Sequence, residues 1–89
     1  MIDATLVPTY TNGLRFQWEE AQQCFVLLYP EGMVKLNPAA GEILSQVDGK
    51  RDINSIIAAL KEKFEGAETI EDDVLAFVEE ALENNWIQL

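Results

Sequence analysis

Apolar residues alternate with polar ones in the first half of the chain and recur at helical spacing in the second half. Leu14, Phe16 and Trp18 alternate with Arg15, Gln17 and Glu19, which is typical of a half-buried strand. An almost unbroken apolar run over residues 24–29 predicts a central strand. A Pro-Glu-Gly turn then leads into a third strand over residues 33–36. The pattern therefore predicts a three-stranded antiparallel sheet, formed as a meander whose first and third strands are its edges.

The helical spacing predicts three helices, over residues 38–47, 53–65 and 70–84. Asn37 and Asp52 are favourable N-caps for the first two, and Pro38 is a favourable first helical residue. A three-stranded antiparallel sheet followed by three helices gives an α+β domain, and the order is winged-helix-like.

Three further signals refine these helices. Gly41 lies inside the first helix and indicates a close backbone approach, and Gly66 is expected to end the second helix. Thr69, with Asp72 three residues later, resembles a capping box at the start of the third helix. After this helix, residues 86–89 form an apolar segment that is expected to dock on the core.

The third helix carries more apolar surface than a core stripe needs. At about 100 degrees per residue, its apolar positions span an arc of roughly 160 degrees, against about 100 degrees for an ordinary surface helix. Leu75 and Leu82 lie at one margin of this arc. A small domain could need such a wide stripe for its core, or the margin could form the wall of a groove. The sequence leaves both interpretations open.

Composition narrows the classes of function. The 89 residues suit one domain, and a hydrophobic content of 48% is typical of a globular core. Six basic and 16 acidic residues give a net charge of -10, which opposes binding to nucleic acid. Eight acids and no base lie in residues 64–89, so this segment suits a partner with a basic patch.

The expected compartment is the cytoplasm. No apolar run approaches the roughly 20 residues of a membrane span, and no signal peptide opens the chain. The single cysteine, Cys24, excludes an internal disulfide and lies in an apolar run, so we expect it to be buried and reduced.

The side chains that carry chemistry are almost absent. The chain has no histidine, which removes the imidazole base of catalytic triads and the commonest metal ligand. One cysteine cannot form a thiolate zinc site, and the glycines do not form a phosphate-binding loop. The pairs at residues 72–73 and 79–80 are adjacent on a helix, so their carboxylates diverge by about 100 degrees. We therefore expect no enzyme activity, no catalytic residue, no metal and no cofactor.

An open strand edge is the feature that invites a partner. The third strand has only Lys35 as a guard against edge pairing and no proline inside it. An extended peptide can add to such an edge, where main-chain hydrogen bonds supply affinity and side-chain pockets supply specificity. An edge of this kind beside an acidic helix with a wide apolar face is well suited to holding a peptide.

Several segments together closely resemble the pyrroloquinoline quinone (PQQ) biosynthesis protein D family. They are Leu14–Glu19, Val26–Asn37, Gly41–Leu44, Val47–Arg51 and Asp72–Val74, and the resemblance spans about residues 14 to 87. The resemblance implies a peptide chaperone. Proteins of this family are the founding type of the precursor-peptide recognition element in ribosomal peptide modification. Such proteins bind a small precursor peptide and present it to a radical-SAM enzyme that joins a glutamate to a tyrosine. The family itself carries no catalytic residue or cofactor.

The resemblance also implies where the peptide binds. In related recognition elements the leader adds as a strand beside the third strand, in the cleft against the third helix. In this chain the peptide-binding residues would be Met33, Val34, Lys35 and Leu36 with Leu75, Val78 and Leu82.

Other classes give rival interpretations. An acidic carrier protein needs a serine that opens a helix, but Ser45 and Ser55 are predicted to lie inside helices. A winged-helix interaction module that binds DNA should have a basic recognition helix, which the acidic third helix is not. A small enzyme is the weakest of the alternatives because the catalytic side chains are missing.

Residues 1–13 are predicted to form an N-terminal arm ahead of a single peptide-binding domain over residues 14–89. Pro8 interrupts the arm, so any strand pairing there should be short. We expect the arm, or the arm of a neighbouring copy in a swapped homodimer, to cover the open edge or an adjacent apolar patch. Deleting the arm should then tighten peptide binding or leave it unchanged.

Overall fold

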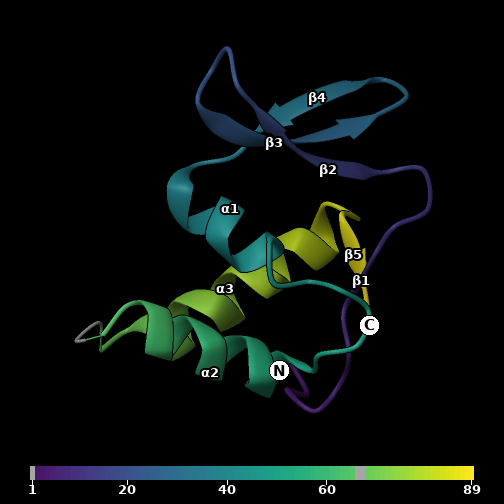
Figure 1. Ribbon diagram of the computed structural model, residues 1–89. Coiled ribbons are helices and arrows are strands. Elements are labelled where there is room, and N and C mark those ends of the chain that lie inside the picture. The colour runs from purple at the N-terminus through teal and green to yellow at the C-terminus, as the bar shows by residue number, and fades with distance from the viewer. Residues whose placement is uncertain (1, 66–67) are drawn as a thin grey trace.

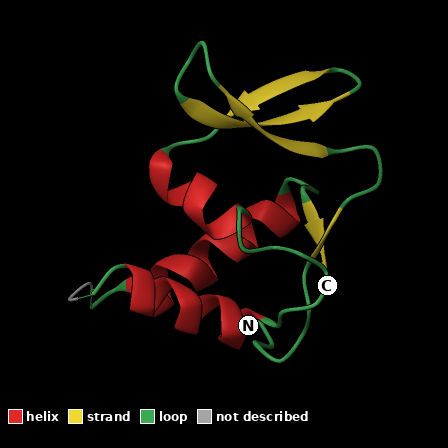
Figure 2. Ribbon diagram, in the orientation of Figure 1, coloured by secondary structure: helices red, strands yellow, loops and turns green. Residues whose placement is uncertain are grey.

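Sheet and helices form two layers in the computed structural model, which describes residues 2–65 and 68–89. The three-stranded sheet consists of β2 (Arg15–Glu19), β3 (Cys24–Tyr29) and β4 (Gly32–Lys35), antiparallel and in that order. Below it lie α1 (Pro38–Leu44), α2 (Ile53–Lys63) and α3 (Ile70–Glu83), as Figures 1 and 2 show. The α+β class and the winged-helix-like arrangement are confirmed. A second, two-stranded sheet pairs β1 (Thr9–Tyr10) with β5 (Ile87–Gln88).

The strand register decides which side chains face the helices. Phe16 pairs with Leu27, which pairs with Val34 on its other side, so these three lie on one face. All three belong to the core or pack against it. The opposite face carries two further cross-strand rows, Arg15 with Leu28 and Met33, and Gln17 with Val26 and Lys35. The first face therefore closes the core, and the second, the outer face, is turned away from the helices.

Local sequence signals account for the first two helix starts. The Asn37 side chain accepts a hydrogen bond from the Ala40 N–H at 2.7 Å, and the Asp52 side chain accepts one from the Ser55 N–H at 2.8 Å. Each cap satisfies a helical N–H that would otherwise have no partner. α1 ends at Leu44, three residues before the predicted end, because a tight turn follows in place of further helix.

The capping box predicted for α3 is wrong. Thr69 adopts φ -100° and ψ 8°, which is not the extended conformation of an N-cap, and its side chain makes no capping bond. Its hydroxyl instead donates to the Asp73 carboxylate at 3.0 Å. Three acids in the first turn, Glu71, Asp72 and Asp73, still complement the positive end of the helix dipole. Gly66, the predicted end of the second helix, lies outside the described residues.

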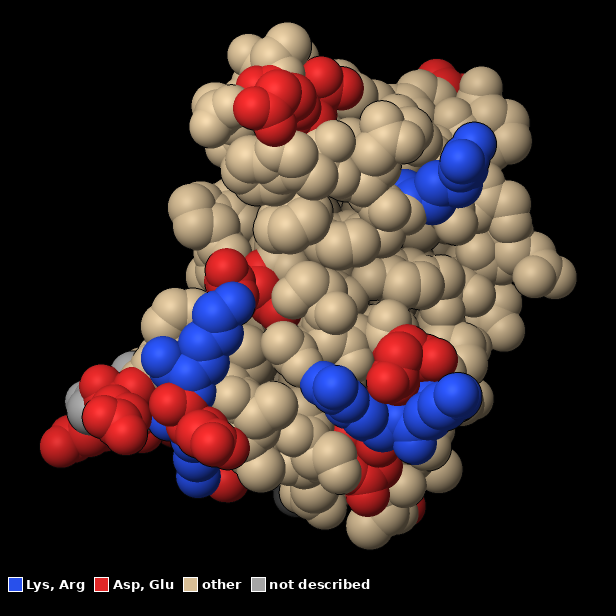
Figure 3. Space-filling model, viewed as in Figure 1, with Lys and Arg blue, Asp and Glu red and all other residues tan. Residues whose placement is uncertain are grey.

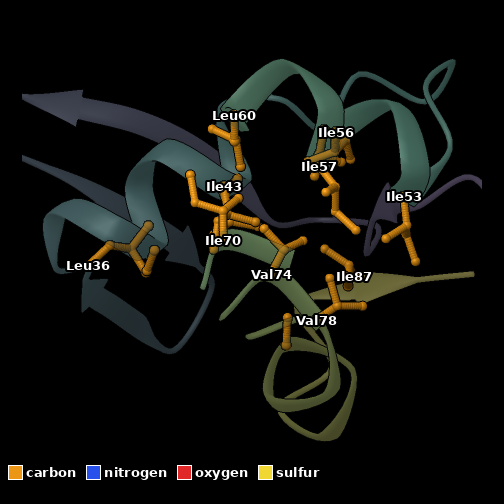
Figure 4. Packing of buried hydrophobic residues seen from close by; sticks show 14 of the residues in the cluster. Leu36, Ile43, Ile53, Ile56, Ile57, Leu60, Ile70, Val74, Val78 and Ile87 are labelled. Atoms are coloured by element: carbon orange, nitrogen blue, oxygen red, sulfur yellow. The ribbon is translucent and has the colours of Figure 1, made fainter. Parts of the chain in front are cut away.

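The core lies where the three helices meet beneath the sheet. Figure 4 shows Ile43, Ile70 and Val74 pointing toward one another, with Leu60 close by. Ile87 of β5 is 3% exposed and belongs to the same cluster, which confirms that the C-terminal segment docks on the core. None of the helices within residues 2–65 and 68–89 is long and apolar enough to cross a membrane.

The N-terminal arm packs on the helical layer and not on the edge of β4. Thr9 pairs with Gln88 and Tyr10 with Ile87, which forms the two-stranded sheet. The Leu6 carbonyl accepts the Ile53 N–H at 3.1 Å, at the start of α2. The expectation that this arm covers the open edge is therefore corrected: its backbone groups are used elsewhere. The swapped homodimer loses the observation that motivated it.

Candidate functional site

β4 is an edge of the sheet, because among the described residues it pairs with β3 alone. Leu36, just after the strand, donates its N–H to the Phe25 carbonyl at 3.0 Å. Hydrogen-bonded and non-bonded pairs alternate along an antiparallel ladder, so Val34 also bonds inward to β3. The N–H and C=O groups of Met33 and Lys35 therefore point to the open edge. Of the four residues predicted to bind the peptide at this edge, three lie in β4 and Leu36 follows it, and Met33 and Lys35 supply the outward-pointing backbone groups.

The side chains near β4 alternate between the two faces. Val34 is half-buried and Leu36 is 6% exposed, both on the core side. Met33 is 42% exposed, and Lys35 is also exposed, on the outer face. A strand added at this edge would meet the backbone of Met33 and Lys35 and the flank of Val34. The Leu36 side chain belongs to the buried core cluster.

α3 presents one of its apolar margins to α2. Glu71 forms an ion pair with Lys61 of α2, with 3.6 Å between nitrogen and oxygen. Leu75, Val78 and Leu82 follow Glu71 by four, seven and eleven residues, which puts all four on one stripe of the helix. Val78 is only 3% exposed, while Leu75 and Leu82 are half-buried. The predicted groove wall is thus the margin of α3 on the α2 side.

The other margin of α3 faces the β4 side of the molecule. Asp73, Phe77, Glu80 and Asn84 follow one another at the same helical spacing. Asn84 lines a hollow of about 490 Å³ together with Val34 and the turn at Tyr29, Pro30 and Glu31. Trp86 lines the same hollow, and its ring centroid is 6.3 Å from that of Phe77. The structure therefore brings Val34 together with the Phe77 margin.

A second hollow lies at the other end of this margin. It encloses about 350 Å³ between the starts of α1 and α3 and the last turns of α2, and its walls are almost entirely apolar. Asp73 and Val74 line it from α3, and Pro38 and Ala39 line it from the segment that follows β4. The stripe from Asp73 to Asn84 thus runs between the two hollows. One hollow is lined by Val34 of β4, and the other by Pro38 and Ala39, which follow β4 in the chain. We call the two hollows and the α3 stripe between them the β4–α3 cleft.

Three titratable groups among the described residues have clearly shifted pKa values. Perturbed pKa values often mark catalytic groups, but the shifted groups lie outside the β4–α3 cleft. Backbone N–H bonds from Arg51 and Lys50 lower the pKa of Asp48, and contacts with Thr5 lower that of Asp3. Burial raises the pKa of Tyr10 above its usual range. In the described part of the chain, no three His, Cys, Asp or Glu side chains are grouped to hold a metal ion.

Sequence reasoning missed Phe77 and Trp86 as residues of the cleft. Phe77 lies at one end of the wide apolar arc of α3, and Leu75 lies at the other. Helical periodicity shows that an arc has two margins, but it cannot tell which margin faces which neighbour. The one available signal was the charge of Lys61 and Glu71, whose pairing assigns one margin to α2.

Comparisons with known proteins find relatives that match most or all of the chain. Residues 24–87 match the family model described as coenzyme PQQ synthesis protein D (PqqD). A PqqA binding protein from Azotobacter vinelandii is 57% identical and is covered to 99% by an alignment spanning 100% of this chain. A PqqA binding protein from Pseudomonas aeruginosa is 58% identical over 93% of this chain and 90% of its own length.

A solved structure shows the same fold. It is the solution NMR structure of the PqqD truncation of Methylobacterium extorquens PqqCD, described as a recognition element for ribosomally synthesized and post-translationally modified peptides. It superposes with a TM-score of 0.82 at 24% identity, over 100% of this chain and 96% of that one. The family match over most of the chain and relatives of nearly the same length lead to one conclusion. The chain belongs to the coenzyme PQQ synthesis protein D (PqqD) family.

Proposed function

We propose that this protein binds the PqqA-type precursor peptide as a strand added to β4 and presents it to a radical-SAM enzyme for Glu–Tyr cross-linking. The free backbone groups of Met33 and Lys35, which lie beside the β4–α3 cleft, are the observation that carries the proposal. Relatives that are more than half identical are PqqA binding proteins. The protein acts as a chaperone in the cytoplasm, where a free thiol such as Cys24 stays reduced.

The bound peptide would use both faces of the extended sheet. Successive side chains of a strand point to opposite faces, so every second peptide side chain would enter the cleft. There it would meet Val34, Phe77 and Trp86, with the two hollows available for larger groups. Leu75 and Leu82 lie on the α2 side, so we assign them to the support of α3 and not to peptide contact. Catalysis belongs to the enzyme partner.

Amide chemical-shift mapping with a synthetic PqqA-type peptide tests the docking site. The largest changes are expected over residues 32–36 and on the α3 stripe from Asp73 to Asn84. Changes centred on Arg15–Glu19 would place the peptide at the opposite edge of the sheet and overturn this docking site. A peptide that causes no change at all would overturn the proposed function.

Two matched pairs of variants sharpen the test. Met33→Pro removes one outward N–H, whereas Met33→Ala removes the side chain and keeps that donor. We expect Met33→Pro to raise the peptide Kd by about tenfold and Met33→Ala by about twofold at most. Phe77→Ala should weaken binding several-fold more than Leu75→Ala, because the two side chains are both half-buried on α3 but lie on opposite margins. Equal effects within either pair would contradict this geometry.

A further inference from the structure

Basic side chains divide into two groups by their partners. Of the six, three form ion pairs: Arg51 with Asp48, Lys61 with Glu71, and Lys63 with Glu42. Arg15, Lys35 and Lys50 have no ion-pair partner within 4.0 Å among the described residues. These three cations are the positive charges that the acids of the described residues do not pair. Two of these three cations lie on the outer face of the sheet.

The outer face combines these cations with apolar surface. Arg15, Leu28 and Met33 form one cross-strand row, in which Leu28 is half-buried and Met33 is 42% exposed. In the next row Val26 lies between Gln17 and Lys35 and is 0% exposed, although it is not part of the core cluster. Long side chains such as those of Gln17 and Lys35 cover apolar surface with their stems, which accounts for this burial. One carboxylate, Glu19, stands at the far end of the face.

No helix covers this face among the described residues. Figures 1 and 2 show all three helices on the opposite side of the sheet. In Figure 3 the blue atoms over the sheet are surrounded by tan atoms, whereas blue and red atoms touch one another over the helices. The outer face is therefore a cationic and partly apolar patch on a molecule with a net charge of -10.

The patch also lies next to the proposed peptide. A strand added to β4 extends the sheet, so alternate peptide side chains emerge on the outer face beside Met33 and Lys35. A protein seated on this face would meet both the sheet and those peptide side chains. This is the position that an enzyme needs if it modifies a peptide while the chaperone holds it.

We propose that the outer face of the sheet, formed by Arg15, Leu28, Met33 and Lys35, docks the modifying enzyme. The complementary surface of that enzyme carries carboxylates around an apolar centre. An acidic surface is repelled by most of this molecule, so the two unpaired cations fix where it can approach. The identity of the partner rests on the proposed function, whereas the chemistry of its surface follows from this face alone.

Charge reversal at Arg15 tests the inference. Arg15 lies on β2, two strands and about 10 Å from the β4 edge, so it can be changed without touching the peptide. Lys50→Glu is the matched control, because it makes the same change of charge at another unpaired cation away from the sheet. The readouts are the Kd of the radical-SAM enzyme for the protein–peptide complex and the Kd of the peptide alone.

We expect Arg15→Glu to raise the enzyme Kd by about tenfold or more and Lys50→Glu by about twofold at most. The peptide Kd should stay within about twofold in both variants. Unchanged enzyme binding in Arg15→Glu, equal losses in the two variants, or no enzyme binding by the wild type would overturn the inference. In those cases normal peptide binding would leave peptide recognition intact. A parallel loss of peptide and enzyme affinity would also overturn it, since the two surfaces would not be separate.

Discussion

Gly41 shows how a single residue sets the distance between the two layers. A Cβ atom built at this position would lie 2.7 Å from Cδ2 of Phe25. The Phe25 ring has little freedom to move, because it lies between two other rings. It stacks on the Phe16 ring with 4.7 Å between the ring centroids, and it makes an edge contact with the Trp18 ring with 5.0 Å between the centroids. Glycine therefore lets α1 lie directly against β3, despite its poor helix propensity.

Gly41→Ala should lower the free energy of unfolding by about 1–2 kcal/mol. Alanine favours the helix by up to about 1 kcal/mol, but the clash costs about 1–3 kcal/mol, and we expect the clash to dominate. Gly32→Ala is the control, since its Cβ would meet nothing within 4 Å. Urea unfolding followed by circular dichroism measures both. A Gly41→Ala variant more stable than the wild type would show that the Phe25 ring can yield.

Tyr10 makes stability sensitive to alkaline pH. Its hydroxyl donates to the Leu44 carbonyl, and burial raises its pKa above the ordinary value of 10.0. The unfolded chain releases the phenolic proton near pH 10 while the folded chain retains it, so the unfolded state is favoured as pH rises further. We expect the stabilisation to be complete below about pH 10 and to decline above it.

Tyr10→Phe separates this effect from other alkaline titrations. The variant loses about 0.5–1.5 kcal/mol at neutral pH because the Leu44 carbonyl loses its donor. It should also show a shallower fall in stability above about pH 10 than the wild type in urea melts. Parallel pH profiles would mean that Tyr10 does not titrate differently in the folded state.

At the scale of elements, the N-terminal arm is a structural part of the domain. Pro8 is among the fully buried side chains, and β1 pairs with β5. The Leu6 and Ala4 carbonyls accept the Ile53 and Asn54 N–H groups, two donors that have no partner inside α2. The arm thus caps α2 and holds the C-terminal strand on the core.

Deleting residues 1–11 should therefore destabilise the protein, by about 2–5 kcal/mol, because buried side chains and a strand pairing are lost together. Thermal melting measures the change, with Leu6→Ala as the control, since Leu6 is 42% exposed and its carbonyl remains. Peptide affinity per folded molecule should not change. If the truncation kept full stability and bound peptide more tightly, the arm would have to reach the β4 edge in solution.

For the whole molecule, the uneven distribution of charge predicts salt-dependent association. The eight acids of residues 64–89 face solvent on and around α3, while the outer face of the sheet holds unpaired cations. Both surfaces attract partners of opposite charge, and salt screens such attraction. We expect the Kd for the peptide or the enzyme to rise by about threefold or more between about 0.05 and 0.5 M NaCl.

Reversal of Glu79 and Glu80 to Lys tests the contribution of α3. The association rate should fall by more than the dissociation rate rises, because long-range attraction acts mainly on encounter. Stopped-flow or surface-plasmon measurements at low salt distinguish the two rates. If neither salt nor these substitutions changed the Kd or the association rate, the acidic face would contribute to solubility and not to binding.

The sequence alone determined the three strands of the main sheet, the three helices and their order. Alternation at Leu14–Trp18, the apolar run at residues 24–29 and the caps Asn37 and Asp52 are local signals, and each acts on neighbouring residues. The family resemblance was equally visible because it is carried by short continuous segments. The absence of histidine limits catalysis through composition alone, because no fold can supply an imidazole that the chain lacks.

The tertiary structure decided which surfaces meet. Helical spacing gave α3 two apolar margins. Only the packing of α2 assigned the Leu75 margin to one side, and only the hollow lined by Val34, Asn84 and Trp86 put the other margin beside β4. Along β4, the backbone groups of alternate residues point to β3 or to the open edge. Only the hydrogen bond from the Leu36 N–H to the Phe25 carbonyl showed that the backbone groups of Met33 and Lys35 point to the open edge. The partner of residues 9–10 lies at residues 87–88, nearly a chain length away. Local patterns determine whether a segment forms a helix or a strand. Which other segments it contacts depends on how the whole chain packs around its core.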